Sequence, residues 1–222
     1  MKQNQKVLIL FSGGMDSLWL LANALQKNPK QNIFVIHFQY GQKTAPKELE
    51  CFYACLGHYE IPQEQYKIIK LDFLPSLLKS SLTSQSIEVN TQGIDLSGKA
   101  LPTSYVPFRN TIFLSLALSW AETDDINEIH IGAVSEDAMG YPDCRPEYYD
   151  QFNKLIKVGS RDGSIKIVTP VIQMKKSAII KDLRDWKSPI EHTWSCYQSN
   201  DLECGKCDSC LLKQAALNTP KS

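Results

Sequence analysis

The sequence predicts an α/β fold: a doubly wound, mostly parallel sheet with a small zinc-binding appendage at its C-terminal end. Three observations support this prediction. Short apolar runs alternate with segments whose apolar residues recur at helical spacing, the first run ends in Ser-Gly-Gly, and four cysteines crowd into residues 196–210. Because parallel strands are joined by helical crossovers, the alternation favours an open sheet with helices on both faces. We assign residues 1–190 to this α/β domain, and residues 191–222 to the four-cysteine appendage and a C-terminal helix.

The first half of the domain contains three expected strands and two expected helices. Residues 7–11 form an unbroken apolar run, which is typical of a strand that is buried on both faces. Residues 16–27 follow as a helix, because Leu18, Leu21 and Leu25 share one helical face. The alternation continues with a strand over residues 33–38, a helix over 47–58 and a strand over 66–71.

Regular patterning stops after the third strand. Residues 72–103 are rich in Ser, Gln, Thr, Gly and Pro and show no clear periodicity. A segment this long and irregular predicts either a mobile substrate loop or a disordered stretch. Helical spacing returns with Ile112, Leu116 and Trp120. The remaining expected elements are helices over residues 109–122, 145–158 and 175–185 and strands over residues 128–132 and 166–169.

Composition narrows the class of function. The 222 residues carry 24 Lys and Arg against 24 Asp and Glu, so the formal net charge is zero. Proteins that hold nucleic acid by its phosphates usually carry a basic excess, so we expect a small-molecule substrate and no nucleic-acid partner. No apolar run approaches the roughly 20 residues of a membrane span, and the first residues lack the apolar core of a signal peptide. We therefore expect a cytoplasmic protein without a membrane partner. A homodimer is compatible with the sequence.

The string Ser-Gly-Gly-Met-Asp-Ser at residues 12–17 lies between the first strand and the first helix, where doubly wound sheets bind ligands. Adjacent glycines let backbone N–H groups approach a phosphate, and the helix N-terminus behind them favours anions. A Gly-Gly turn is common in α/β proteins, but the flanking strand, the helix and Asp-Ser favour phosphate binding. Asp16 is suited to Mg²⁺, which prefers carboxylate and phosphate oxygens. The expected phosphate-binding residues are Leu10, Phe11, Ser12, Gly13, Gly14, Met15, Asp16 and Ser17.

Four of the seven cysteines have metal-ligand spacing: Cys196-x7-Cys204-x2-Cys207-x2-Cys210. Four thiolates with two short Cys-x2-Cys spacings suit the tetrahedral coordination of Zn²⁺. A thioredoxin-like dithiol needs only two cysteines, whereas an iron–sulfur cluster could use the same four. We favour structural zinc, because four cysteines saturate the metal, and keep the iron–sulfur cluster as the alternative.

Two polar segments precede expected helices: Val-Pro-Phe-Arg-Asn at residues 106–110 and Gly-Tyr-Pro-Asp-Cys-Arg at residues 140–145. Arg109 would neutralise a phosphate or a substrate carboxylate. Asp137 and Asp143 would accept hydrogen bonds from the N–H edge of a guanine-like base. The alternative is that each is an ordinary helix cap or surface charge, and the spacing alone favours that alternative.

The loop at residues 12–17 resembles that of the PP-loop ATP pyrophosphatase superfamily, whose members cleave ATP between the α- and β-phosphates. This resemblance implies ATP binding, with nucleoside contacts at Phe38, Tyr40 and Gly41. The chain also resembles the QueC family of 7-cyano-7-deazaguanine synthases. The similarity lies in the two polar segments, Thr-Pro at residues 169–170, Ser-Cys-Tyr at residues 195–197 and the cysteine spacing. The similarity runs from about Val7 to about Leu217.

The resemblance implies that 7-carboxy-7-deazaguanine and ammonia are converted into 7-cyano-7-deazaguanine (preQ0) through adenylated intermediates in queuosine or deazapurine biosynthesis. ATP and Mg²⁺ are the implied cofactors beside Zn²⁺. The implied catalytic residues are Asp16, Arg109, Asp143 and Lys175. The implied substrate contacts are Asp137, Gly140, Tyr141 and Arg145.

Other readings of the motifs remain open. The chain could be a QueC-like enzyme with another acceptor, or one that stops at the amide, as in a defence system. It could also be another amidating or thiolating PP-loop enzyme. A reading from a different class, a zinc-bearing nucleic-acid-binding module, is disfavoured by the zero net charge.

The sequence departs from the usual family pattern at several positions. The family usually has Asp-Tyr-Gly-Gln-Arg-His after the second strand, and this chain has Gln-Tyr-Gly-Gln-Lys-Thr at residues 39–44. Phe108 stands where a glycine usually precedes the Arg-Asn pair, and Lys213 stands where an arginine is common. The phosphate loop and the cysteine spacing are intact, so the departures concern the substrate and the extent of reaction.

Overall fold

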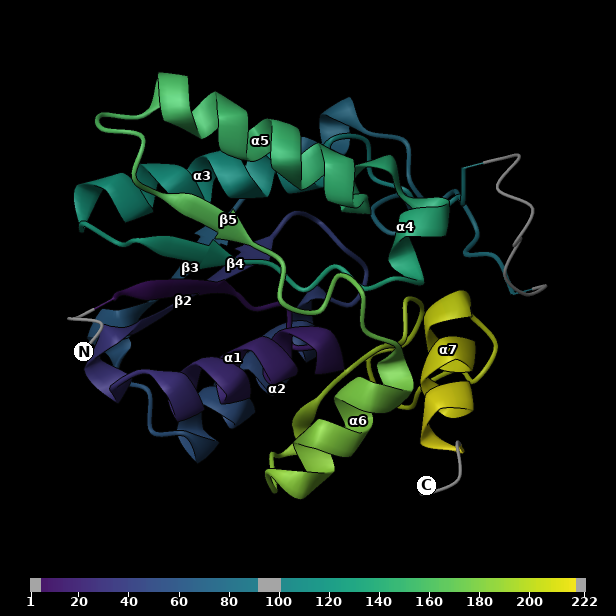
Figure 1. Cartoon of the computed structure of the whole chain (residues 1–222). Coiled ribbons are helices and arrows are strands. Elements are labelled where there is room, and N and C mark those ends of the chain that lie inside the picture. The colour runs from purple at the N-terminus through teal and green to yellow at the C-terminus, as the bar shows by residue number, and fades with distance from the viewer. Residues whose placement is uncertain (1–4, 92–100, 219–222) are drawn as a thin grey trace.

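A five-stranded parallel sheet, in the order β3-β2-β1-β4-β5, forms the centre of the molecule. The computed structural model describes residues 5–91 and 101–218. Its strands are β1 Val7–Leu10, β2 Ile33–Gln39, β3 Tyr66–Lys70, β4 Glu128–His130 and β5 Lys166–Val168. The chain winds outward from β1 to β3 and then restarts on the other side of β1 with β4 (Figure 1). The winding therefore reverses between β1 and β4, which is where doubly wound sheets bind their ligands.

Helices cover both faces of the sheet (Figure 1). Helices α3 (Arg109–Thr123) and α5 (Pro146–Gly159) lie on one face. Helices α1 (Met15–Lys27), α2 (Ala45–His58) and α6 (Lys176–Asp185) lie on the other. The fold is thus a three-layer sandwich of helices, sheet and helices.

Strand β1 shows why an unbroken apolar run is needed at the centre of such a sheet. Leu8 and Leu10 pack into the apolar cluster beneath α3 and α5, whereas Val7 and Ile9 pack into the cluster formed with α1, α2 and α6. All four side chains are buried. Because successive residues of a strand point to opposite faces, every position of β1 must be apolar.

The C-terminal part packs against the main body. Helix α7 (Asp208–Leu217) lies beside α6 (Figure 1). The backbone N–H of Trp194 donates to the carbonyl of Gly13 at 3.0 Å, and the amide of Gln198 donates to the carbonyl of Val89 at 3.3 Å. The four-cysteine segment is therefore anchored to the phosphate loop and to the segment after β3. The division of the chain at residue 190 stays a prediction.

The ten strands and helices expected from the sequence are all present, and their ends agree to within two residues. The irregular segment, residues 72–103, differs from what the sequence predicts. Its described part is packed: Leu82 is 6% exposed, and the N–H of Ser81 donates to the carbonyl of Thr103 at 2.8 Å. The expectation of disorder is therefore wrong for that part, because contacts with distant residues hold it. Residues 92–100 lie outside the described residues.

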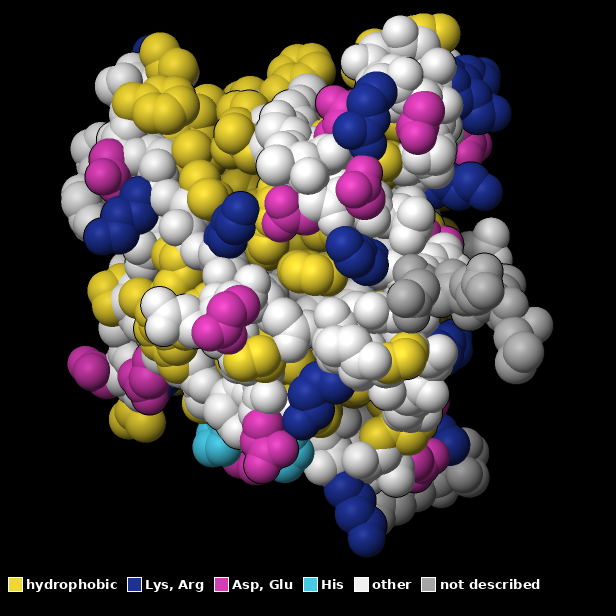
Figure 2. All heavy atoms as spheres, turned by 90° about the vertical axis from the view of Figure 1, so that its left-hand side faces the viewer, with side chains coloured by type: hydrophobic (Ala, Val, Ile, Leu, Met, Phe, Trp, Pro, Cys, Tyr) yellow, Lys and Arg dark blue, Asp and Glu magenta, His cyan; other side chains and the backbone are white. Residues whose placement is uncertain are grey.

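The end of the molecule that carries the N-terminal ends of the strands shows no concentration of one charge. On this face, basic and acidic side chains are interspersed, and hydrophobic side chains gather at the upper left and toward the centre (Figure 2). Within residues 5–91 and 101–218, no helix is both long and apolar enough to cross a membrane.

Candidate active site

A cavity of about 250 Å³ opens at the point where the winding of the sheet reverses. The phosphate loop at residues 12–17 forms one wall. Residues 104–110 and the segment from Asp137 to Cys144 form another, and residues 194–197 complete the lining beside the cysteine cluster. The phosphate loop precedes the two polar segments by about ninety residues or more in the chain, yet all three face the same space.

The phosphate loop is held open by its own side chains. The Ser17 hydroxyl donates to the carbonyl of Gly14 at 2.8 Å and accepts from the N–H of Ser12 at 3.2 Å. The first intrahelical bond of α1 runs from the N–H of Leu18 to the same Gly14 carbonyl at 3.0 Å. The N–H groups of the first turn therefore have no partner within the helix, which is the arrangement that binds phosphates.

Gly13 is required by this loop for two reasons. Its φ is +90°, a value that L residues rarely adopt, and a Cβ there would lie 2.7 Å from the carbonyl oxygen of Glu48. The tight turn between β1 and α1 therefore needs glycine at this position.

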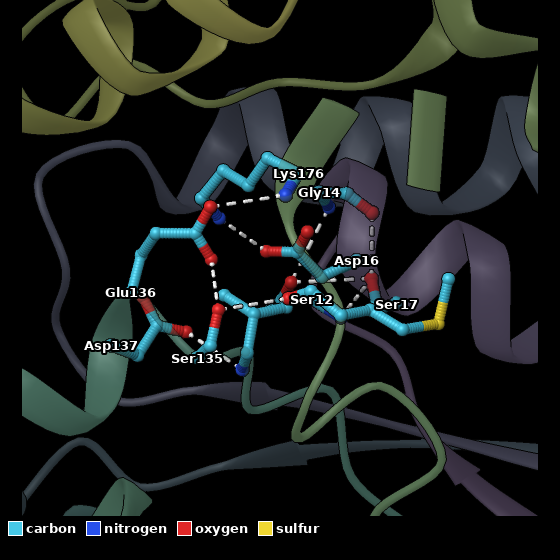
Figure 3. A network of polar contacts seen from close by, with 10 residues as sticks. Ser12, Gly14, Asp16, Ser17, Ser135, Glu136, Asp137 and Lys176 are labelled. Atoms are coloured by element: carbon cyan, nitrogen blue, oxygen red, sulfur yellow. Dashed lines mark hydrogen bonds and ion pairs between the residues drawn. The ribbon is translucent and has the colours of Figure 1, made fainter. Parts of the chain in front are cut away.

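A buried ion pair lies beside the loop (Figure 3). The Lys176 ammonium is 2.7 Å from Asp16 Oδ2, and the two side chains are 12% and 22% exposed. Burial alone would lower the pKa of Lys176, but the nearby charges of Asp16 and Asp137 outweigh it and raise that pKa above its ordinary value. Burial also raises the pKa of Asp137, while Lys176 opposes the shift. Lys176 thus stays protonated between two acidic side chains.

Asp16 retains capacity for a further ligand. Its Oδ1 is buried and has no hydrogen-bond partner among the described residues. A buried carboxylate oxygen without a partner is unfavourable, so this atom suits a cation. Gly132, which follows β4, makes room for the loop, since a Cβ there would lie 3.3 Å from the Asp16 carbonyl carbon.

Arg109 begins α3 and faces the cavity. Its guanidinium donates to the Tyr40 hydroxyl at 3.3 Å and lies 5.8 Å from the centre of the Tyr40 ring and 5.9 Å from that of Phe113. The residue before it, Phe108, has φ +53° and is exposed. The left-handed turn explains why glycine suits this position in the family, and Phe108 adopts it at a steric cost.

One carboxylate oxygen of Asp143 holds the backbone at the start of α3. Its Oδ2 accepts from the N–H of Asn110 at 3.1 Å, and the Asn110 amide donates to the Asp143 carbonyl at 2.9 Å. The carboxylate thus caps the N-terminus of α3. Nearby, the hydroxyls of Tyr141 and Ser104 lie 2.8 Å apart, so the second polar segment is tied to the chain just before the first.

The cavity brings most of the predicted site residues together. Those that line it are Leu10, Phe11, Ser12, Gly14, Met15, Asp16, Ser17, Phe38, Tyr40, Arg109, Asp137, Tyr141 and Asp143. Apart from the metal ligands, five predicted residues do not line it: Gly13, Gly41, Gly140, Arg145 and Lys175. The three glycines instead shape the backbone, as at Gly41, where φ is +80° and a Cβ would lie 2.2 Å from Pro75 Cγ.

The two cations outside the cavity lie on the surface. Arg145 is exposed, and its Nε donates to the carbonyl of Ala138 at 3.4 Å. Lys175 is the exposed N-cap of α6, and the lysine in the cavity is the next residue, Lys176. The placement of Lys175 in the site is therefore corrected: the helix begins one residue later than expected, so its first residue carries the charge into the cavity.

Sequence reasoning also missed several residues of the lining. Glu48 accepts from the Thr44 hydroxyl at 2.7 Å and from the Gln42 amide at 2.9 Å, and thereby holds the turn after β2. Asn110 and Tyr197 also line the cavity, and in the sequence they stand out only as members of the strings at residues 106–110 and 195–197. Glu48 belongs to an ordinary amphipathic helix, and no local signal in the sequence distinguishes it from a surface acid.

The four cysteines predicted as metal ligands converge. The sulfurs of Cys196, Cys204, Cys207 and Cys210 all lie within 4.8 Å of one another. Gly205, at φ +67°, permits the tight turn between two of them. Burial would raise the pKa of Cys204, but backbone N–H groups, from Lys206 at 3.5 Å and from Cys207 at 3.4 Å, contribute to lowering it to about 7. Four soft donors with N–H support fit a thiolate-bound metal.

Comparisons with known proteins agree with this geometry. The family model of the queuosine biosynthesis protein QueC matches residues 6–221. A 7-cyano-7-deazaguanine synthase of Chlorobaculum parvum is 48% identical over 212 residues, which cover 95% of this chain and 91% of that protein. The enzyme of the same name from Chlorobium phaeovibrioides is 45% identical with the same coverage.

Solved structures support the fold class. The U34-tRNA thiolase NcsA from Methanococcus maripaludis, with its [4Fe-4S] cluster, matches with a TM-score of 0.52 and 17% identity, over 97% of this chain and 65% of its own. NMN synthetase from Francisella tularensis matches with a TM-score of 0.51 and 14% identity, over 99% of this chain and 80% of its own. The predicted PP-loop fold is confirmed. With the family match over nearly its whole length, the chain belongs to the QueC family of queuosine biosynthesis proteins.

Proposed function

We propose that this chain synthesises 7-cyano-7-deazaguanine from 7-carboxy-7-deazaguanine and ammonia, with two molecules of ATP consumed per nitrile. One observation carries the proposal: the phosphate loop and the Tyr141–Asp143 string line a single cavity. An enzyme that adenylates its substrate must hold the α-phosphate and the acceptor oxygen within reach of each other. The names of relatives at 45–48% identity support the same reaction.

The chemistry consists of two adenylations. In the first, a carboxylate oxygen of the substrate attacks the α-phosphorus of ATP and pyrophosphate leaves. Ammonia then displaces AMP, loses a proton and leaves the amide. In the second, the amide oxygen attacks a fresh ATP, pyrophosphate leaves again, and loss of AMP and protons gives the nitrile. Neither step needs a nucleophilic side chain, so catalysis depends on position and on charge neutralisation.

The residues of the cavity fit these tasks. The N–H groups at the start of α1 and the hydroxyls of Ser12 and Ser17 would bind phosphate oxygens. Asp16, through its unpartnered Oδ1, would hold Mg²⁺, which neutralises charge on the phosphates when bound. Lys176 lies beside Asp16 and would share that neutralisation.

We assign zinc to the four-cysteine cluster. Its donors are four sulfurs, so a bound zinc ion would have no open coordination position and would serve the fold. Cys196 and Tyr197 both line the cavity, so the cluster would also fix part of the substrate wall.

Mass analysis of the products tests the function. Wild-type protein with the acid, ammonium and Mg-ATP should yield the nitrile with two AMP and two pyrophosphate. With the amide supplied as substrate, the nitrile should appear with one AMP. Release of ADP and phosphate, or inertness toward both acid and amide while Mg-ATP still binds, would contradict the proposal. Accumulation of the amide would support the enzyme that stops halfway.

A further inference from the structure

We propose that Arg109 recognises the charge of the acceptor: it binds the substrate carboxylate for the first adenylation and contributes little to the second, whose acceptor is a neutral amide. The proposal rests on the function proposed above and deepens it. It makes Arg109 a residue that distinguishes the two half-reactions within one cavity.

The first argument is that the Arg109 charge has no acidic partner in the described structure. Its hydrogen bond goes to the Tyr40 hydroxyl, and its guanidinium lies against the rings of Tyr40 and Phe113. No ion pair to Arg109 occurs among residues 5–91 and 101–218. Lys176, the other cation of the cavity, differs in that Asp16 pairs with it directly.

Two of the groups near Arg109, Tyr40 and Cys144, stay neutral. Burial raises the pKa of Tyr40, although the charge of Arg109 opposes the shift, and burial raises the pKa of Cys144 to about 12. Asp143 is close, but its Oδ2 accepts from the N–H of Asn110 instead of from the guanidinium. Asp143 and Asp137 attract Arg109 electrostatically, but neither forms an ion pair with it. A partly desolvated cation without a paired counter-charge is unfavourable in the free protein, so its neutralisation by an anionic ligand is a gain on binding.

The second argument concerns which anion Arg109 meets. The phosphate loop, Asp16 and Lys176 form one group of contacts, in which the helix N-terminus and a paired ammonium serve phosphate. Arg109 belongs to another group, with Tyr40 and the Asp143–Cys144 string, and Asp137 interacts with members of both groups. A planar guanidinium matches a carboxylate with two parallel hydrogen bonds. Arg109 is therefore placed for the carboxylate of the acceptor.

The two half-reactions then make different demands on one side chain. The acid brings a full negative charge to Arg109, whereas the amide brings only a carbonyl dipole. Removing the guanidinium should therefore weaken the acid far more than the amide. If Arg109 instead neutralised the α-phosphate, both half-reactions would suffer alike, because each uses ATP.

The experiment compares Arg109→Met and Arg109→Lys with wild type on the acid and on the amide separately. For Arg109→Met we expect kcat/KM to fall about 100-fold or more on the acid, the effect of removing one partner of a desolvated charge pair. On the amide we expect a fall of less than about fivefold, as for the loss of one ordinary hydrogen bond. Arg109→Lys should recover part of the loss on the acid, because it keeps the charge without the planar fork.

Arg161→Met is the matched control, since Arg161 is exposed and its guanidinium pairs with the surface residue Asp125. It should match wild type on both substrates. Calorimetry of acid binding and of amide binding to wild type and to Arg109→Met measures the same difference in affinity without turnover. Melting temperature and zinc content show whether Arg109→Met is folded, and Arg109→Lys carries the test if it is not.

Equal losses on acid and amide, or a raised KM for ATP with acid affinity unchanged, would overturn the inference. A wild-type protein inert toward both acceptors would instead refute the proposed function, and no difference between variants would then be measured. The two failures are therefore distinguishable.

Discussion

At the scale of single residues, adjacent lysines show where sequence reasoning reaches its limit. The sequence predicts a helix start near residue 175 and a cation there, but the choice between Lys175 and Lys176 depends on one residue of helical phase. In the structure Lys175 is the exposed N-cap, and Lys176 forms an ion pair with Asp16 beside the phosphate loop (Figure 3). The partner lies 160 positions away in the chain, so no local pattern could have selected it.

These neighbours form a matched pair of variants. Lys176→Met should lower turnover on acid and amide by about 100-fold, as loss of a charge that stabilises the transition state does. Lys175→Met should change it less than twofold. AMP formation in the steady state measures both. The raised pKa of Lys176 means that it stays protonated below its folded pKa, so alkaline loss of its proton should not limit the rate below about pH 10. Equal defects in the two variants would contradict the placement of Lys176.

At the scale of elements, strands and helices are predictable because the local spacing of apolar residues shows which positions are buried. Strand β1 is apolar at every position, and it lies at the centre of the sheet. The segment after β3 was not predictable in the same way. The Lys43 ammonium donates to the carbonyl of Ile87 at 2.9 Å, and Gln198 holds Val89. Its order comes from such distant partners, which leave no periodic signal.

The cysteine cluster is an element whose stability should depend on its metal. Elemental analysis should find about one zinc per chain, and Cys207→Ser should abolish it, because one ligand of a saturated four-thiolate site is lost. Since metal binding is coupled to folding, the melting temperature should fall by at least about 5 °C. Cys51→Ser is the control, because Cys51 lies on α2 outside the cluster. If the protein is brown and contains iron and sulfide, the cluster binds an iron–sulfur centre and the zinc assignment is wrong.

At the scale of the whole molecule, the sequence predicts the class of sheet but not its strand order. Alternating strands and helices are compatible with several orders, and only tertiary packing decides that β4 lies beside β1. That choice creates the site, because it sets the loop after β1 next to the segments after β4. The predicted site residues from Leu10 to Asp143 meet for this reason, although no local pattern joins them.

The distribution of charge leads to the last prediction, that the chain does not bind tRNA. The thiolase NcsA shares the fold, but fold alone does not carry a partner from one protein to another. This chain has no net charge, and both signs are interspersed on the face in Figure 2, which lies opposite the cavity. Without a basic excess, few phosphate counterions would be released on contact with RNA.

Fluorescence anisotropy of labelled tRNA should therefore show no complex below about 10 µM protein at about 150 mM salt, where even non-specific binders are weak. Any binding at low salt should disappear steeply as salt is raised, which is the signature of non-specific contact. Addition of tRNA should leave the rate of pyrophosphate release from the acid unchanged, since the proposed acceptor is a free base. A micromolar complex that persists at 150 mM salt, or a rate that rises with tRNA, would contradict the small-molecule acceptor and favour a thiolating or other RNA-directed enzyme of this fold.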